Sequence, residues 1–260
     1  MTPTANQPIK NISKLKLNKL NNYHSYFIDI LILLILLLPY FLILLGNHPL
    51  IDPDEGRYSE VAINMLKTGD YLIPKLNGVI FFDKPILFYW LQVISFKLFG
   101  ISEFSIRFFP ALSACITCIG CYIFSRKLFT RKIGLGAAFI LATMFYWFCL
   151  AHFANMDIEV ACWVSLSTLS FLTGLTEKKT PVNNRYINAG YCFAGVAFLT
   201  KGLIGIVFPA ATIGIWILLC NKWHLIPKLK LINGICLFLI ITLPWLIAVQ
   251  MQFPIFFKYF

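Results

Sequence analysis

The sequence is poor in charge, and poorest in acid. Charged residues make up 13% of its 260 positions, with 22 Lys and Arg against 11 Asp and Glu. A soluble domain carries about a quarter charged residues. Apolar residues make up 59% of the chain, and the mean hydropathy is +0.77. So little charge excludes a small soluble globular fold.

Several sites with well-known sequence signatures are also missing. The chain has no Walker loop, no dinucleotide-binding glycine fingerprint and no His-Glu zinc signature. Cys115, Cys118 and Cys121 recur every three residues in an apolar stretch with no histidine nearby, so they indicate a helix face and not a zinc site. No disulfide framework is predicted from the eight cysteines. The basic residues lie between apolar runs, which argues against a nucleic-acid partner.

What the chain does have is a series of apolar runs, several near the roughly 20 residues that cross a bilayer. We therefore predict an all-α polytopic membrane protein. Residues 1–26 are basic, rich in Asn and free of acid, and we predict a disordered cytoplasmic tail there. The predicted spans are residues 27–46, 108–125, 133–151, 160–175, 187–199, 203–220 and 231–249.

The distribution of basic residues predicts the topology. Fourteen of the 22 lie in residues 1–26, 126–132, 178–185 and 222–230, which we place on the cytoplasmic side. An odd number of crossings must then separate residue 52 from residue 126. Only two apolar runs are available, so the shorter one, residues 86–99, is predicted to lie in the membrane interface. This gives seven crossings and an outer loop over residues 47–107.

The outer loop concentrates the acid of the chain. Within it, residues 61–66 predict a short surface helix that Gly69 ends. Asp54 fits two roles, the cap of that helix or, with Glu55, a general base or cation ligand. Six of the 11 carboxylates fall between residues 52 and 83: Asp52, Asp54, Glu55, Glu60, Asp70 and Asp83.

Three further positions are candidates for binding. Asp83 and Lys84 precede an aromatic run and fit a metal ligand and a phosphate clamp, or simple snorkelling at the interface. Lys201 is the only charged residue between Tyr186 and Lys222. A charge at such depth usually has a function and an ionic partner, which a phosphate or Asp157 would supply.

These residues resemble a known family, the aminoarabinose transferase type of lipid-linked-sugar glycosyltransferases, within the protein mannosyltransferase-like superfamily that has the GT-C fold. The likeness runs from about residue 27 to residue 260. The motifs that carry it are Asp54-Glu55-x-Arg57-Tyr58-x-Glu60, Gly69-Asp70-Tyr71, Asn77-Gly78, Phe82-Asp83-Lys84-Pro85-Ile86-Leu87-x-Tyr89-Trp90, Arg107-Phe108, Asp157, Leu199-Thr200-Lys201-Gly202 and Leu243-Pro244-Trp245.

The resemblance implies transfer of a sugar from a polyprenyl-phosphate carrier to lipid A, a glycan or a protein on the outer, periplasmic face of a bacterial inner membrane. It implies Asp54 as base, Asp83 as ligand of a divalent metal where these transferases usually have Glu, and Lys84 on the donor phosphate. The predicted catalytic residues are Asp54 and Glu55, the predicted substrate-binding residues are Arg57, Tyr58, Lys84, Asp157 and Lys201, and the predicted metal ligand is Asp83.

In that family the next outer loop supplies a His for the metal and an Arg for phosphate. The resemblance therefore implies that these residues are the N-terminal part of the transferase domain, inactive alone, and that further chain or a second polypeptide completes the site. The alternative function is a transporter or flippase in which Lys201 and Asp157 line a substrate path. No duplicated half is visible in the sequence, and the acids gather in one loop, which favours the enzyme.

The topology predicts opposite sidedness for Ser59 and Thr130. On a background without native cysteines, a membrane-impermeant thiol reagent should label a cysteine at residue 59 from outside the cell and one at residue 130 only after permeabilisation. Labelling of both from the same side would contradict the predicted topology.

Overall fold

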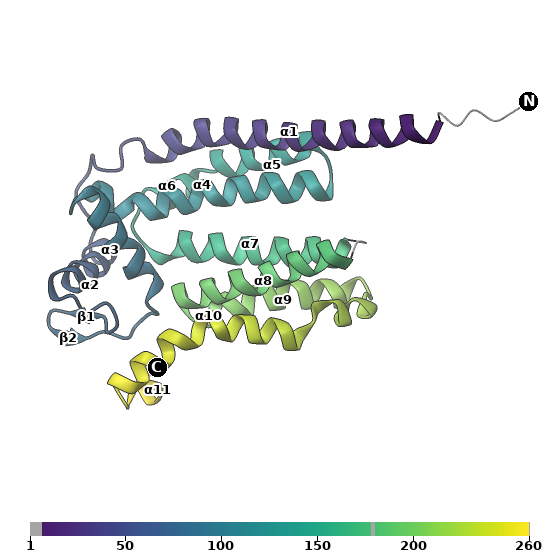
Figure 1. Cartoon of the computed structure of the whole chain (residues 1–260). Helices are drawn as coiled ribbons and strands as arrows, with labels where there is room; N and C mark the ends of the chain where they lie inside the picture. Colours follow the sequence, from purple (N-terminus) through teal and green to yellow (C-terminus); the bar gives the residue numbers. More distant parts are fainter. Residues whose placement is uncertain (1–6, 178–179, 260) are drawn as a thin grey trace, which may run out of the picture.

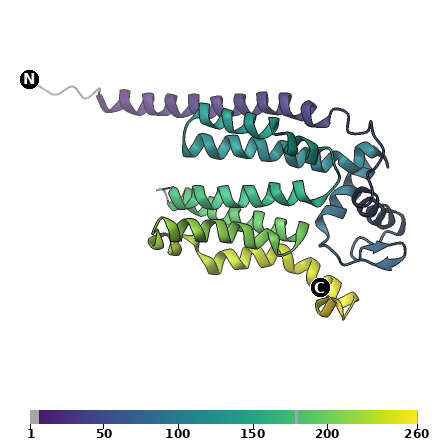
Figure 2. The same ribbon diagram turned by 180° about the vertical axis from the view of Figure 1, so that it is seen from behind.

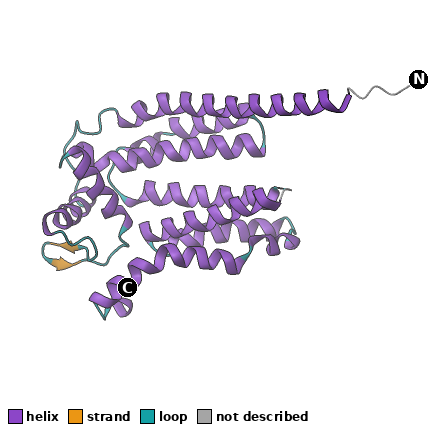
Figure 3. Cartoon of the chain, viewed as in Figure 1, coloured by secondary structure: helices purple, strands orange, loops and turns teal. Residues whose placement is uncertain are grey.

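The computed structural model describes residues 7–177 and 180–259, and in them the protein is a bundle of long helices with a small group of elements at one end (Figures 1 and 2). Strands are confined to one short hairpin in that group (Figure 3). The elements are α1 (Gln7–Leu42), α2 (Asp54–Thr68), β1 (Lys75–Leu76), β2 (Val79–Ile80), α3 (Leu87–Phe99), α4 (Glu103–Leu128), α5 (Arg131–Thr143), α6 (Phe145–Ala151), α7 (Met156–Thr176), α8 (Thr180–Lys201), α9 (Ile204–Leu219), the 3-10 helix η1 (Trp223–Leu229), α10 (Leu231–Gln252) and α11 (Phe256–Tyr259).

The long helices have the length and composition of membrane spans. Among the described residues, four helices are both long enough and apolar enough to cross a membrane, and the number is five if α5 and α6 count as one bent span. Large apolar side chains stand exposed on their flanks, such as Ile232 at 80% and Leu219 at 79%, as expected for lipid-facing surfaces. The predicted all-α polytopic membrane fold is confirmed. The helix α9 is shorter, and the count of seven crossings stays a prediction.

One sequence prediction about the N-terminal tail is wrong. The tail over residues 1–26 was expected to be disordered, yet α1 begins at Gln7. Its sequence has no glycine, and no proline between its first turn and Pro39, so nothing ends the helix of the first span there. Residues 1–6 and the basic pair Lys178 and Lys179 lie outside the described residues.

The stretch over residues 133–151, predicted to be one span, forms two helices in the structure. The chain bends by 66° between α5 and α6, because Met144 adopts an extended backbone. Just before the bend, the Thr143 hydroxyl donates to the carbonyls of Phe139 and Ile140 at 2.9 and 3.2 Å. Such back-bonding competes with the regular helix ladder and favours a break.

The elements α2, β1, β2 and α3 with their loops, which we call the outer group after the predicted outer loop, follow their prediction more closely. The surface helix expected over residues 61–66 is the longer α2, and Gly69 ends it with φ of 73°, a conformation that favours glycine. Asp54 does not cap α2, because it is the first helical residue, preceded by Pro53 with no side-chain cap. Its negative charge in the first turn still matches the helix dipole. The aromatic run over residues 86–99 forms α3, which packs against α2 and α4.

At the other end of the bundle, a buried aspartate joins three helices. Asp29 of α1 is 2% exposed and receives hydrogen bonds from Arg126 of α4 at 2.7 Å and Arg131 of α5 at 2.6 and 2.7 Å. The Tyr122 hydroxyl adds a fourth donor at 2.6 Å. Two guanidinium groups therefore compensate the one buried carboxylate, and α1 is fixed against α4 and α5.

Replacing Asp29 with Asn should lower the stability of the bundle by about 3 kcal/mol, because it leaves the buried Arg126 without its carboxylate. Thermal unfolding in detergent micelles measures the loss. Glu103→Gln removes an exposed carboxylate from α4 and serves as the control. Equal melting temperatures for the two variants would show that the Asp29 contacts add little.

Candidate functional site

A cavity of about 830 Å³ opens where the outer group meets the helix bundle, and we call it the outer cavity. Its wall combines one residue of α2, the loop that leads to α3, and the junction of α8 and α9. The residues that line it are Arg57, Phe81, Phe82, Asp83, Lys84, Pro85, Phe198, Lys201, Gly202, Leu203 and Ile204. Four of the predicted site residues thus share one wall, with three cations and one acid among them.

Lys201 reaches the cavity because α8 ends at that residue. Gly202 has φ of 73°, and its N–H donates to the Phe198 carbonyl at 2.7 Å, which closes the last turn before α9 starts at Ile204. A residue with a side chain would be strained in this conformation. Lys201 stands in the last turn of α8, at the negative end of the helix dipole, where a cation is electrostatically well placed.

Asp157 pairs with Lys201 across the mouth of the bundle. It lies in the first turn of α7, where Asn155 caps the helix by accepting from the Asp157 N–H at 2.9 Å. The side chain of Asp157 is 51% exposed and that of Lys201 is 24% exposed. Asp157 does not line the cavity, so its contribution is to hold the Lys201 ammonium that does.

Three of the predicted acids act electrostatically on Tyr58. Tyr58 is buried against Phe88 and Tyr89. Its pKa is raised first by this burial and then by the negative charges of Asp54, Asp83 and Asp157, with Arg57 opposing them. Carboxylates from α2, the loop before α3 and α7 therefore act on one point.

Asp83 also has a cation beside it on the cavity wall. The Lys84 ammonium lies 3.3 Å from Asp83, and both groups are partly exposed, at 28% and 44%. The three acids around Tyr58 and the three cations of the wall make a site of mixed charge at the edge of an apolar bundle.

Arg107 of α4 holds this outer group in place, and the sequence predictions assigned it no role. It is completely buried and makes two bonds to Glu55, at 2.8 and 2.7 Å. Its other donors reach the carbonyls of Leu45, His48 and Pro49 at 2.8 to 3.0 Å. One guanidinium thus ties the end of the first span, the loop after it and α2 to α4.

Glu55 completes the same network. Its oxygens also accept from the backbone N–H groups of Ile51 at 2.8 Å and Ala154 at 2.7 Å. Burial alone would raise the pKa of Glu55, but the bonds from Arg107, Ala154 and Ile51 outweigh it and hold the pKa below the ordinary value. The predicted catalytic role does not fit a carboxylate that is 0% exposed with both oxygens engaged. We infer that Glu55 positions its neighbour Asp54.

One signal in the sequence points to Arg107. It is the only basic residue between Lys97 and Arg126, and it stands at the start of an apolar span. A guanidinium at that depth needs a carboxylate partner. The sequence does not say which acid of the outer loop provides it.

The resemblance implies a divalent metal, and Asp83 is its predicted ligand in this chain. In the described part of the chain, no three His, Cys, Asp or Glu side chains gather as a metal site. Asp83 is occupied by Lys84 at 3.3 Å. Divalent ions need several oxygen or nitrogen ligands, so these residues alone do not make a complete site.

The family model described as dolichyl-phosphate-mannose-protein mannosyltransferase matches residues 83–247, more than half of the chain. The chain belongs to this family. The match begins at Asp83 and includes Lys84, Arg107, Asp157 and Lys201. Asp54 and the rest of α2 precede it.

Curated relatives of this mannosyltransferase-family chain share one name. It is 34% identical over 207 residues to the undecaprenyl phosphate-alpha-4-amino-4-deoxy-L-arabinose arabinosyl transferase of Wigglesworthia glossinidia brevipalpis, covering 78% of this chain and 36% of that protein. It is 30% identical to the enzyme of the same name from Aeromonas salmonicida, covering 86% and 41%. The chain therefore spans about two-fifths of the length of these relatives.

Solved structures confirm the fold. The crystal structure of ArnT from Cupriavidus metallidurans in the apo state superposes with a TM-score of 0.83 at 27% identity, covering 89% of this chain and 43% of that one. The structure of the same protein bound to undecaprenyl phosphate gives 0.80 at 29% identity, covering 86% and 42%. The resemblance to the aminoarabinose transferases and their GT-C fold, inferred from the motifs, is confirmed.

The lowered pKa of Glu55 predicts how stability changes with pH. Its contribution is present above the ordinary value of 4.5 and is lost as pH falls through the lower folded value. Glu55→Gln should reduce stability at neutral pH by about 3 kcal/mol, and the gap to the wild type should narrow below about pH 4.5. Melting temperatures across that range measure this.

Glu60→Gln removes an exposed carboxylate from the same helix and is the matched control, expected to follow the wild type. A constant gap between Glu55→Gln and the wild type at all pH values would contradict the assigned role of the Glu55 charge.

Proposed function

We propose that this chain forms the donor-binding part of a glycosyltransferase that takes a sugar from a polyprenyl-phosphate carrier. The observation that carries the proposal is the outer cavity, whose wall places Arg57, Lys84 and Lys201 beside the ends of apolar helices. An amphiphile with an anionic phosphate and a long apolar tail matches a cationic cavity at the border of a membrane bundle. We place this cavity on the outer, periplasmic face of the inner membrane.

The cations have a direct task in this reaction. As the bond between the sugar C1 and the phosphate oxygen breaks, negative charge grows on the leaving polyprenyl phosphate. Lys84 and Lys201 neutralise that charge, and groups fixed before the reaction are the most effective at this. The contact with Asp157 holds Lys201 in place, and Arg57 offers a forked donor for phosphate oxygens.

Asp54 takes the proton in this proposal. The acceptor hydroxyl oxygen forms the new bond to C1 as the bond from C1 to the carrier phosphate breaks, and Asp54 orients that hydroxyl and accepts its proton. The burial of Glu55, one residue along, fixes the backbone at the start of α2. Asp54 stands three residues before the cavity-wall residue Arg57 on α2, so the two can face the same way, which supports placing the acid and the cavity in one site.

The comparisons support the donor class. The relatives are named for undecaprenyl phosphate-linked 4-amino-4-deoxy-L-arabinose, and a structural neighbour was solved with undecaprenyl phosphate. We propose the same carrier here, with lipid A, a glycan or a protein as acceptor. Asp83 would contribute one ligand to a divalent metal, with further ligands from outside these residues. Since the chain spans about two-fifths of its relatives, we propose that transfer requires further chain or a second polypeptide.

In a complete enzyme that contains these residues, Lys201→Ala should lower the rate of sugar transfer by about a hundredfold, since it removes charge stabilisation from the transition state. Asp54→Asn should abolish transfer while leaving the binding of undecaprenyl phosphate close to normal. Turnover of a radiolabelled lipid-linked sugar in membranes measures the transfer rate of both variants, and binding of undecaprenyl phosphate to the purified protein measures the affinity.

Lys75→Ala is the control, because Lys75 lies in the same outer loop but pairs with Asp70 at 3.1 Å, outside the cavity wall. A transporter would keep moving its substrate after Asp54→Asn and would show no transfer in any variant. Near-normal transfer by Lys201→Ala would remove Lys201 from the mechanism.

A further inference from the structure

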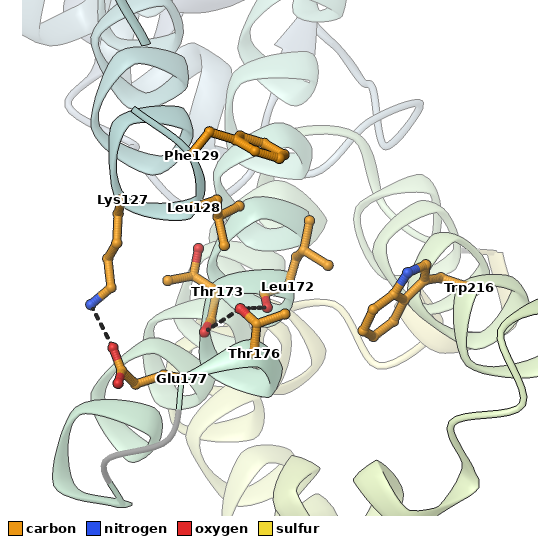
Figure 4. A pocket seen from close by; sticks show the side chains of 8 residues that line it. All are labelled: Lys127, Leu128, Phe129, Leu172, Thr173, Thr176, Glu177 and Trp216. Carbon is orange, nitrogen blue, oxygen red and sulfur yellow. Dashed lines mark hydrogen bonds and ion pairs between the residues drawn. The ribbon is translucent and has the colours of Figure 1, made fainter. Parts of the chain in front are cut away.

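A second cavity, of about 660 Å³, lies at the opposite end of the bundle, and we call it the basic-end cavity. It is formed where α4 and α7 end, with one residue of α9 as a side wall (Figure 4). No motif in the sequence points to it. The residues that line it are Lys127, Leu128, Phe129, Leu172, Thr173, Thr176, Glu177 and Trp216.

One ammonium group, that of Lys127, lines this cavity, and a second lies against the ring of a lining residue. The Lys127 ammonium lies 3.1 Å from the Glu177 carboxylate and 4.3 Å from the centre of the Tyr186 ring. Lys222 lies over the ring of Trp216, 4.2 Å from its centre. Figure 4 shows the pair of Lys127 and Glu177 on one side, Trp216 on the other, and the threonines between them.

A buried hydroxyl adds an unused polar group. Thr173 is 1% exposed, and its hydroxyl has no hydrogen-bond partner in the part of the chain that the structure describes. The neighbouring Thr176 hydroxyl is already committed to the carbonyls of Leu172 and Thr173, at 2.9 and 3.1 Å. Buried hydroxyls are rarely left without a partner, so Thr173 indicates that an oxygen-bearing ligand enters the cavity.

The rest of the wall is apolar. Leu128, Leu172 and Trp216 contribute it, and Phe129 at its edge is 67% exposed. A soluble anion would gain nothing from these side chains, but the glycerol and first methylenes of a lipid would. Basic pockets between spans are known to take anionic headgroups.

We propose that the basic-end cavity binds the headgroup of an anionic phospholipid. Its phosphate lies between the Lys127 ammonium and the Thr173 hydroxyl, and its acyl chains follow Leu172 and Trp216 toward the membrane. Such a lipid links the ends of α4, α7 and α9. The site is separate from the outer cavity and does not depend on the proposed function.

Native mass spectrometry of the purified chain in detergent tests this, with dioleoyl-phosphatidylglycerol and dioleoyl-phosphatidylethanolamine as probes. The wild type should retain phosphatidylglycerol in preference to phosphatidylethanolamine. Lys127→Ala should weaken phosphatidylglycerol binding by about fivefold, as expected for one lysine near an anionic lipid. Thr173→Val, which keeps the volume and removes the hydroxyl, should weaken it as well, and it covers the case in which Lys127→Ala fails to fold.

Lys132→Ala is the matched control, since it removes a positive charge from the same end of the bundle, at an exposed position outside the cavity wall. Unchanged binding by this variant supports a defined site. Equal losses in Lys127→Ala and Lys132→Ala, or equal retention of the two lipids by the wild type, would overturn the proposal. Displacement of the lipid by millimolar glycerol phosphate would also overturn it, because a soluble anion would then suffice.

Discussion

The buried pair of Glu55 and Arg107 is the interaction on which the outer site depends. Both side chains are 0% exposed, so the charge of each is compensated by the other and by backbone groups. Removing either partner would leave a charge in the core, which is far more costly than losing a surface ion pair. Because the pair joins α2, α4 and the loop after α1, the outer group behaves as one unit with the membrane helices.

This attachment explains how distant segments meet at one cavity. Arg57 follows Glu55 by two residues on α2, so the buried pair that fixes α2 also fixes the position of Arg57. Lys201 arrives from the other side, where Gly202 ends α8, and Asp157 holds it through an ion pair. The Trp245 indole of α10 also donates to the Leu72 carbonyl at 3.3 Å, a second link between the outer group and the bundle. A site built between two such bodies can bind a ligand that itself spans membrane and water.

Much of this was predictable from the sequence because its signals are local. Apolar runs predicted the helical membrane fold, and Gly69 predicted the end of α2. The isolation of Lys201 predicted an ionic partner, either a phosphate or Asp157, and the structure has the pair with Asp157. Three features were not predictable in this way. The bend at Met144 depends on hydroxyl contacts with the preceding turn. The helical state of residues 7–26 depends on the span that follows. The partner of Arg107 depends on the tertiary fold. Glu55 and Asp54 look alike in the sequence, and only their difference in burial supports the positioning role proposed for Glu55 and the catalytic role proposed for Asp54.

The Glu55–Arg107 pair determines the shape of the outer cavity, because it fixes the outer group against the end of α8. Cysteines at Lys84 and Leu203, two positions on the same cavity wall, can report this on a background without native cysteines. We predict that a short bis-maleimide bridges them rapidly, and that adding Arg107→Gln slows the bridging strongly while the protein stays folded in the membrane. Equally rapid bridging with and without Arg107→Gln would contradict the account.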